Sequence, residues 1–168
     1  AVPLTTDHDE LVLLAGTVPA AASAGAGRPR ILALDVDDGG VRWTTGLAGV
    51  PDMPTQRIDR MVVERSGALI TRGHVAGLPA LQILVAAREV RSGGIRWQRE
   101  PASLGTMSAT PDDDLMVTDD GAVVVSGSGR LTDGSGVFHA VKLGVADGNE
   151  RWTATLPRSV EGTTTRLG

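Results

Sequence analysis

The sequence of 168 residues contains no cysteine, and this absence excludes three kinds of site at once. Without cysteine the chain has no disulfide framework, no thiolate metal centre and no cysteine nucleophile. Aromatic residues are also scarce, with three Trp, one Phe and no Tyr. We therefore expect a core of Val, Leu, Ile and Ala, in which each Trp anchors a specific contact.

Positive charge and long apolar runs are lacking too. The net charge is −4 and the sequence has no run of Lys or Arg, which argues against a surface for nucleic acid. No apolar segment approaches the roughly 20 residues of a membrane helix, so we expect no membrane insertion. By contrast, 22 Gly and 9 Pro residues indicate many turns, and many turns favour short strands over long helices.

The three tryptophans, Trp43, Trp97 and Trp152, each end a similar eleven-residue phrase, and they lie 54 and 55 residues apart. The phrases read ALDVDDGGVRW, AREVRSGGIRW and KLGVADGNERW. Self-similarity at a constant period predicts a repeat architecture. We place the three units at approximately residues 1–50, 51–105 and 106–160.

Within each unit, short runs of Val, Leu and Ile are bounded by Gly, Asp and Ser, which is typical of β-strands. Two apolar runs joined by a turn are followed by a variable loop, a third run, a tight turn and the strand that carries the Trp. The pattern predicts an all-β chain of three four-stranded antiparallel meanders. In the first unit, the first strand is either missing or contained in residues 1–8.

Glycine and arginine recur at fixed places beside each Trp. Gly39, Gly93 and Gly148 follow Asp or Ser in the tight turn, where a hairpin demands the positive φ that glycine adopts readily. Strand alternation directs the residue before each Trp away from the face that carries the Trp. This residue is always an Arg: Arg42, Arg96 and Arg151. We interpret these arginines as solvated; a ligand-binding row of arginines is the alternative.

Two acidic segments invite a metal-binding interpretation. The turn at residues 35–40 resembles a calcium loop, but Gly39 stands where the fifth position needs an oxygen donor. Residues 112–120 place five carboxylates around one short strand, and surface turns are rich in Asp for ordinary reasons. Asp59 and Asp113 hold equivalent positions in two units, which indicates a structural carboxylate.

Histidine and lysine offer no stronger candidate. His8, His74 and His139 fall at three different positions of the repeat, which argues against a shared metal or catalytic site. His139 alternates in phase with apolar neighbours and is predicted to be packed or at a strand edge. Lys142, the only lysine, is predicted to lie on a solvated face and not to form a Schiff base. We assign no catalytic, cofactor-binding or metal-binding residue.

The phrase that ends in Trp resembles the PQQ-like β-propeller repeat, also called the quinoprotein tryptophan-docking motif, which reads Ala-x-Asp-x-x-Thr-Gly-x-x-x-Trp. The matching positions are Ala33, Asp35, Gly39 and Trp43 in the first unit, Ala87, Gly93 and Trp97 in the second, and Gly148 and Trp152 in the third. The resemblance implies a β-propeller in which each unit is one blade and each Trp packs against the neighbouring blade.

Closed propellers usually have about four to eight blades, so three blades imply a partial disc. Further blades of the same polypeptide, a protein partner or a homo-oligomer would complete it. The resemblance implies a non-catalytic scaffold or binding module of the secreted bacterial type, extracellular or periplasmic, with no cofactor. The alternative is part of a PQQ- and calcium-dependent quinoprotein dehydrogenase, and fold alone does not decide between them.

Overall fold

The computed structural model describes residues 2–5, 11–19, 27–46, 56–76, 81–101, 114–130 and 136–157. Within these ranges the chain forms twelve β-strands and no helix. The all-β prediction is confirmed. It follows from a sequence that is rich in β-branched residues and is interrupted every few residues by Gly, Asp or Ser.

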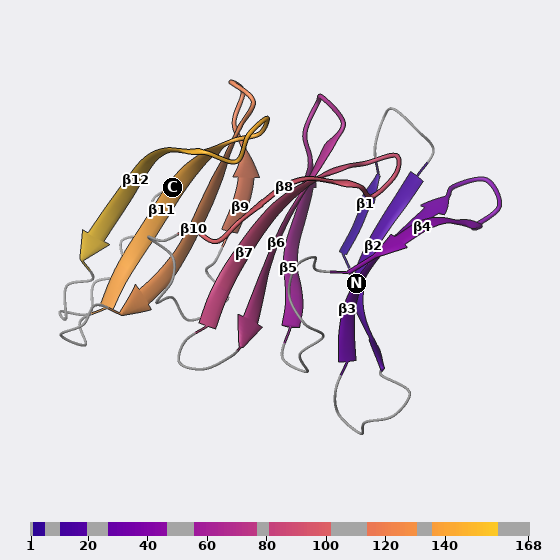
Figure 1. Cartoon of the computed structure of the whole chain (residues 1–168), viewed down its shortest axis with the longest axis horizontal. Coiled ribbons are helices and arrows are strands. Elements are labelled where there is room, and N and C mark those ends of the chain that lie inside the picture. The colour runs from indigo at the N-terminus through magenta and orange to yellow at the C-terminus, as the bar shows by residue number, and fades with distance from the viewer. Residues whose placement is uncertain are drawn as a thin grey trace.

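The strands form three antiparallel sheets of four strands each, and strands that are consecutive in sequence are neighbours in the sheet (Figure 1). The first sheet contains β1 (Val2–Thr5), β2 (Leu11–Pro19), β3 (Gly27–Asp35) and β4 (Val41–Thr45). The second contains β5 (Gln56–Val63), β6 (Ala68–Ala76), β7 (Leu81–Glu89) and β8 (Ile95–Arg99). The third contains β9 (Asp114–Val117), β10 (Ala122–Arg130), β11 (Gly136–Gly144) and β12 (Glu150–Pro157).

This arrangement confirms the three predicted four-stranded meanders, and it resolves the open question in the first unit, because β1 lies within residues 1–8. Each described sheet is open: its first and last strands do not pair with each other. The second sheet stands between the first and the third (Figure 1). The described part of the chain is therefore an arc of three consecutive sheets.

The turn before each Trp-bearing strand has the same backbone in all three sheets. Gly39, Gly93 and Gly148 have φ of 70°, 70° and 67°. All the positive-φ residues of the described chain are glycines, because a Cβ makes this conformation costly. The strand pairing shifts register at one equivalent place in each sheet, next to Ala33, Ala87 and Lys142. The extra residue, Arg42, Arg96 or Arg151, lies on the Trp-bearing strand, and such a bulge bends this strand and increases its local twist.

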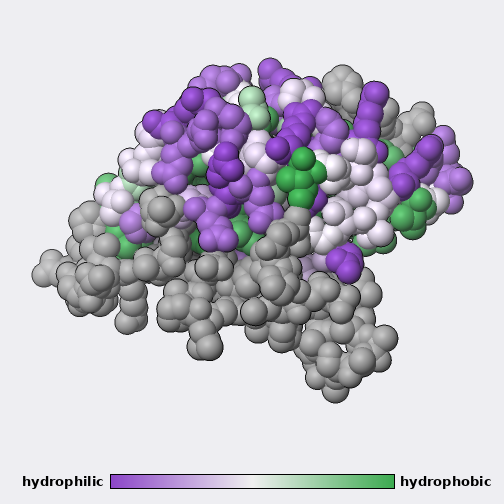
Figure 2. Space-filling view, in the orientation of Figure 1, coloured by the Kyte–Doolittle hydropathy of each residue, from purple (hydrophilic) through white to green (hydrophobic). Residues whose placement is uncertain are grey.

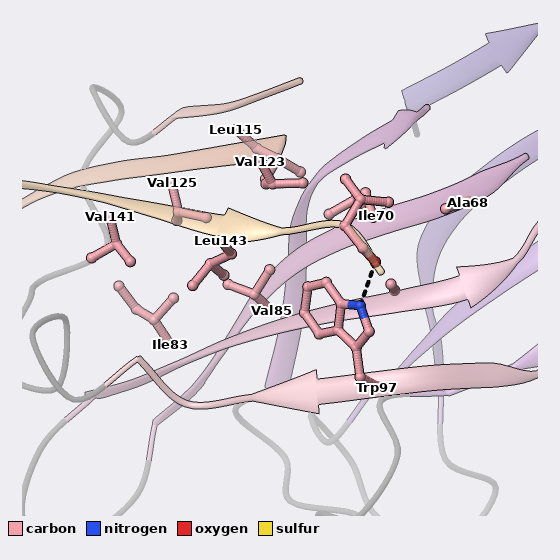
Figure 3. Close-up of a cluster of buried hydrophobic side chains, with 12 residues drawn as sticks. Ala68, Ile70, Ile83, Val85, Trp97, Leu115, Val123, Val125, Val141 and Leu143 are labelled. Atoms are coloured by element: carbon pink, nitrogen blue, oxygen red, sulfur yellow. Dashed lines mark hydrogen bonds between the residues drawn. The ribbon is translucent and has the colours of Figure 1, made fainter. Parts of the chain in front are cut away.

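Side-chain alternation gives the second sheet two buried faces. In β6, Leu69 packs with Leu13 and Ile31 of the first sheet, whereas its neighbour Ile70 packs with Val125 and Val141 of the third. The second of these cores is shown in Figure 3. Sheets that stack face to face remove apolar surface from water, and each Å² buried stabilises the packing by about 25 cal/mol. This burial stabilises the arrangement of the three sheets.

Two valines provide a matched test of this core. Val141 is fully buried between the second and third sheets, whereas Val41 is 60% exposed on the first. We expect Val141→Ala to lower the free energy of unfolding by about 2–3 kcal/mol, through lost burial and a cavity. We expect Val41→Ala to cost less than about 1 kcal/mol. Urea unfolding measures both, and equal losses would contradict the assigned core.

Candidate functional site

Trp97 joins the second sheet to the third. It is supplied by β8, its side chain is 6% exposed, and its indole N–H donates a hydrogen bond of 2.6 Å to the carbonyl of Val145 (Figure 3). The face of its ring lies over Gly148, in the turn between β11 and β12. A buried Trp needs a partner for its N–H, and here the backbone of the next sheet supplies it.

Trp43 makes the same contact one sheet earlier. Its indole N–H donates a hydrogen bond of 3.0 Å to the carbonyl of Val90, and its ring lies over Gly93. Val90 and Val145 hold equivalent positions in the repeat, and so do Gly93 and Gly148. We call this pair of interactions the docking contact: a Trp N–H bound to a Val carbonyl, with the Trp ring on a turn glycine of the following sheet.

The turn glycine serves the docking contact as well as the turn. A Cβ built on Gly93 would lie 2.7 Å from Cε3 of Trp43, and one on Gly148 would lie 2.6 Å from the ring of Trp97. Both distances are shorter than carbon atoms tolerate. At Gly39, the equivalent residue of the first sheet, a Cβ would meet no described atom within 4 Å. The acceptor turn of the first sheet is thus open.

Trp152 belongs to the last sheet and is 44% exposed. It pairs in register with Lys142, as Trp97 pairs with Ala87, and it therefore lies on the face that points away from the second sheet. Beside it is a hollow of about 350 Å³, which is also lined by Asp120, Lys142 and Arg151. In the second sheet the corresponding place, beside Trp97, is filled by the turn of the third sheet.

Other large apolar side chains surround Trp152. Phe138 and Leu156 face each other across β11 and β12, on the same face of the sheet as Trp152 and four residues along the strands from the Lys142–Trp152 pair. Met116, on β9, belongs to this face as well, since it pairs with Val124, which pairs with Lys142. Met116, Phe138 and Leu156 are all exposed. We call this open face of the third sheet, with Met116, Phe138, Trp152 and Leu156, the donor face.

The first sheet presents the opposite surface. Its outward face carries Val12, Leu14, Leu32, Leu34 and Val36, and Val36 is 49% exposed. We call this surface, together with Gly39, the acceptor face. The equivalent residues of the third sheet are buried against the second sheet: Val123, Val125, Val141, Leu143 and Val145. All five positions are aliphatic in both sheets.

Arg88 is a buried residue at the junction of the first two sheets that the sequence reading did not identify. Its side chain is fully buried, and it donates hydrogen bonds to the carbonyl of Gly46 at 2.7 Å and to Oγ1 of Thr45 at 3.3 Å. Burial lowers the pKa of its guanidinium group. The sequence does mark this position as unusual, because Arg88 stands where the other two units have Leu34 and Leu143.

The arginines that precede the tryptophans each pair with a carboxylate beside the same hairpin. Arg42 binds Asp35 and Arg96 binds Glu89, on the strand before the turn. The third unit has Gly144 at that position, and Arg151 binds Asp147 within the turn instead. Arg42 and Arg151 are well exposed, so the pairs support the interpretation of solvated arginines that stabilise the hairpins.

The remaining sequence candidates have structural partners. Asp59 lies at a bulge of β5 and pairs with Nδ1 of His74 at 2.8 Å and with buried Arg72 at 3.3 Å. His139 is buried, as predicted, and its Nδ1 contacts Oγ1 of Thr155 at 2.9 Å. Lys142 pairs with Asp120 at 2.6 Å on the donor face. His8, Asp112 and Asp113 lie outside the described residues.

No known family model matches the sequence, and no curated protein matches it either. Among the described residues, no three His, Asp or Glu side chains converge into a set that could hold a metal ion. In the same ranges, no helix is long and apolar enough to cross a membrane. The described surface in Figure 2 is mainly hydrophilic, with small and separate hydrophobic patches. The protein is thus an all-β chain whose repeated feature is the docking contact.

Alanine substitutions at two glycines distinguish the free energy lost by straining the turn from the free energy lost by disturbing the docking contact. Gly148→Ala and Gly39→Ala both place a Cβ at positive φ, at about 1–2 kcal/mol each. Only Gly148→Ala also forces a Cβ into the ring of Trp97, which we expect to add about 1–3 kcal/mol. Urea unfolding of dilute protein measures the difference, and equal losses would contradict the role of the docking contact in stability.

Acid is expected to weaken the third sheet through Asp120. Hydrogen bonds from Lys142 and then Thr118 lower the pKa of this carboxyl below its ordinary value of 3.8. The folded state therefore gains stability from Asp120 above the unfolded pKa, and it loses this stability as pH falls through the folded pKa. When the pH falls from neutral to below 3.8, the free energy of unfolding should decrease in both proteins. The decrease should be smaller in Asp120→Asn than in the parent.

Chemical unfolding at the two pH values measures this loss. Asp119→Asn removes the same charge from the neighbouring turn residue and controls for the change in net charge. A loss in Asp120→Asn as large as in the parent would show that the Lys142 pair does not couple stability to pH.

Proposed function

We propose that the chain is a non-catalytic β-propeller scaffold or binding module, and that it works as a segment or subunit of a larger propeller or assembly. The observation that carries this proposal is the docking contact. It joins the first sheet to the second and the second to the third, and the two halves of a further contact are exposed at the ends of the arc.

The surfaces at the two ends support a role in binding protein. An isolated arc leaves the outer faces of two sheets in water, and sheets of this kind gain stability when a neighbour covers them. The donor face combines Trp, Phe, Met and Leu side chains. Of these, Trp, Phe and Met are enriched at protein interfaces. A further sheet or a protein partner of similar shape would bury both faces.

The described polar groups support a structural role better than catalysis. The carboxylate of Asp59 pairs with the side chains of Arg57, Arg72 and His74. Lys142 is paired with Asp120, and buried His139 contacts a hydroxyl. The dehydrogenase alternative requires carboxylate ligands for calcium, and the described residues offer no cluster of such ligands.

Electron microscopy of the native protein tests the propeller arrangement. We expect discs in which the sheets lie radially around a central axis, with the tryptophans between consecutive sheets. A stack of sheets without such an axis would contradict the propeller.

A dye-reduction assay with added PQQ, calcium and a panel of alcohols and sugars tests the non-catalytic role. We expect no reduction above that of the heat-inactivated protein. Substrate-dependent reduction of the dye would overturn the proposal in favour of the dehydrogenase.

A further inference from the structure

We propose that the donor face binds the acceptor face of a second copy of this chain, head to tail, with Trp152 of one copy on the turn at residues 36–39 of the other. This inference rests on the proposed function and names its partner. The indole N–H of Trp152 would donate to the carbonyl of Val36, and its ring would cover Gly39.

The chain already makes this contact twice. Trp43 binds Val90 and covers Gly93, and Trp97 binds Val145 and covers Gly148. The donor of a third contact, Trp152, and its acceptor turn, residues 36–39, are present in the same chain and are both exposed. They belong to the outermost sheets on opposite sides of the second sheet, so one copy cannot bring them together without a further neighbour.

The acceptor face also has the composition of a surface that a neighbouring sheet covers. At the five positions that receive a neighbouring sheet, the third sheet has Val123, Val125, Val141, Leu143 and Val145. The first sheet is aliphatic at all five, whereas the second sheet has Thr71 and Arg88 among its equivalents. The acceptor face is therefore a docking surface of the same aliphatic kind as the one the third sheet uses, and a solvated outer face would favour polar residues there.

The contact is heterologous, because the two faces differ. Head-to-tail contacts of this kind close into a ring or continue as a chain. Each copy contributes three sheets, so two copies joined at both ends would hold six, within the usual range of about four to eight blades for a closed propeller.

The native mass of the parent and of two single variants tests the inference by light scattering. We expect the parent to have at least twice the mass of one chain, 17.3 kDa. Trp152→Ala removes the donor and Gly39→Ala blocks the acceptor, and each variant alone is expected to fall to the mass of one chain. Both residues are exposed within one copy, so circular dichroism and the urea midpoint verify that the variants are folded.

Mixing the two variants is the decisive step. Trp152→Ala retains a complete acceptor face and Gly39→Ala a complete donor face, so an equimolar mixture should form two-chain species and nothing larger. Gly67→Ala is the matched control, because Gly67 also has positive φ, of 78°, but a Cβ there makes only an ordinary contact with Val90. This variant should keep the mass of the parent.

Several results would overturn the inference. They are a monomeric parent, single variants that assemble like the parent, or a mixture that stays monomeric. If the parent is monomeric and microscopy still shows radial sheets covered by further blades or by another protein, the proposed function stands and only the second copy is excluded. Dye reduction with PQQ would overturn the proposed function itself, whatever the mass.

Discussion

The structure depends on one repeated interaction, the seating of a tryptophan on a turn glycine of the following sheet. A four-stranded sheet has two faces and cannot bury both alone. The Trp ring covers part of the next sheet, and its N–H satisfies a backbone carbonyl there. The interaction therefore combines apolar burial with a specific hydrogen bond, and it fixes the order and relative placement of the sheets. The aliphatic side chains of the two facing sheets supply the rest of the buried apolar surface.

The two junctions share this interaction but differ in the rest of their chemistry. The junction of the second and third sheets is lined by aliphatic side chains around Trp97. The junction of the first and second sheets adds Arg88, a buried cation that is bound by the backbone and a hydroxyl of the first sheet. Burying a charge costs several kcal/mol unless hydrogen bonds offset it, and the hydrogen bonds from Arg88 to Thr45 and Gly46 offset part of this cost.

The functional interpretation follows from the ends of the arc. The polar residues between them pair with one another, whereas the outer faces leave a tryptophan and an acceptor turn in water. The binding role that we propose for the chain therefore rests on its exposed sheet faces. The similarity of the two exposed halves to the buried contacts is what makes a second copy the proposed partner.

Much of the fold could be predicted from the sequence, and the reason is local. Alternating Val, Leu and Ile with Gly-containing turns specify strands and hairpins, and the spacing of the tryptophans specifies three similar units. The same alternation predicted that the arginines before the tryptophans point away from the Trp-bearing face, and that His139 is packed or at a strand edge. Weak or unusual signals were less informative, as with β1, whose presence the sequence left open.

The sequence by itself thus determined the strands, the turns and the positions of the tryptophans, because each depends on neighbours a few residues away. The tertiary structure decided which carbonyl each Trp binds and why its glycine has no room for a Cβ. It also decided that Arg88 is buried and that Trp152 and Gly39 lie on open faces. The two docking contacts join residues that are 47 and 48 positions apart in the sequence, and such contacts arise only when one sheet packs on the next.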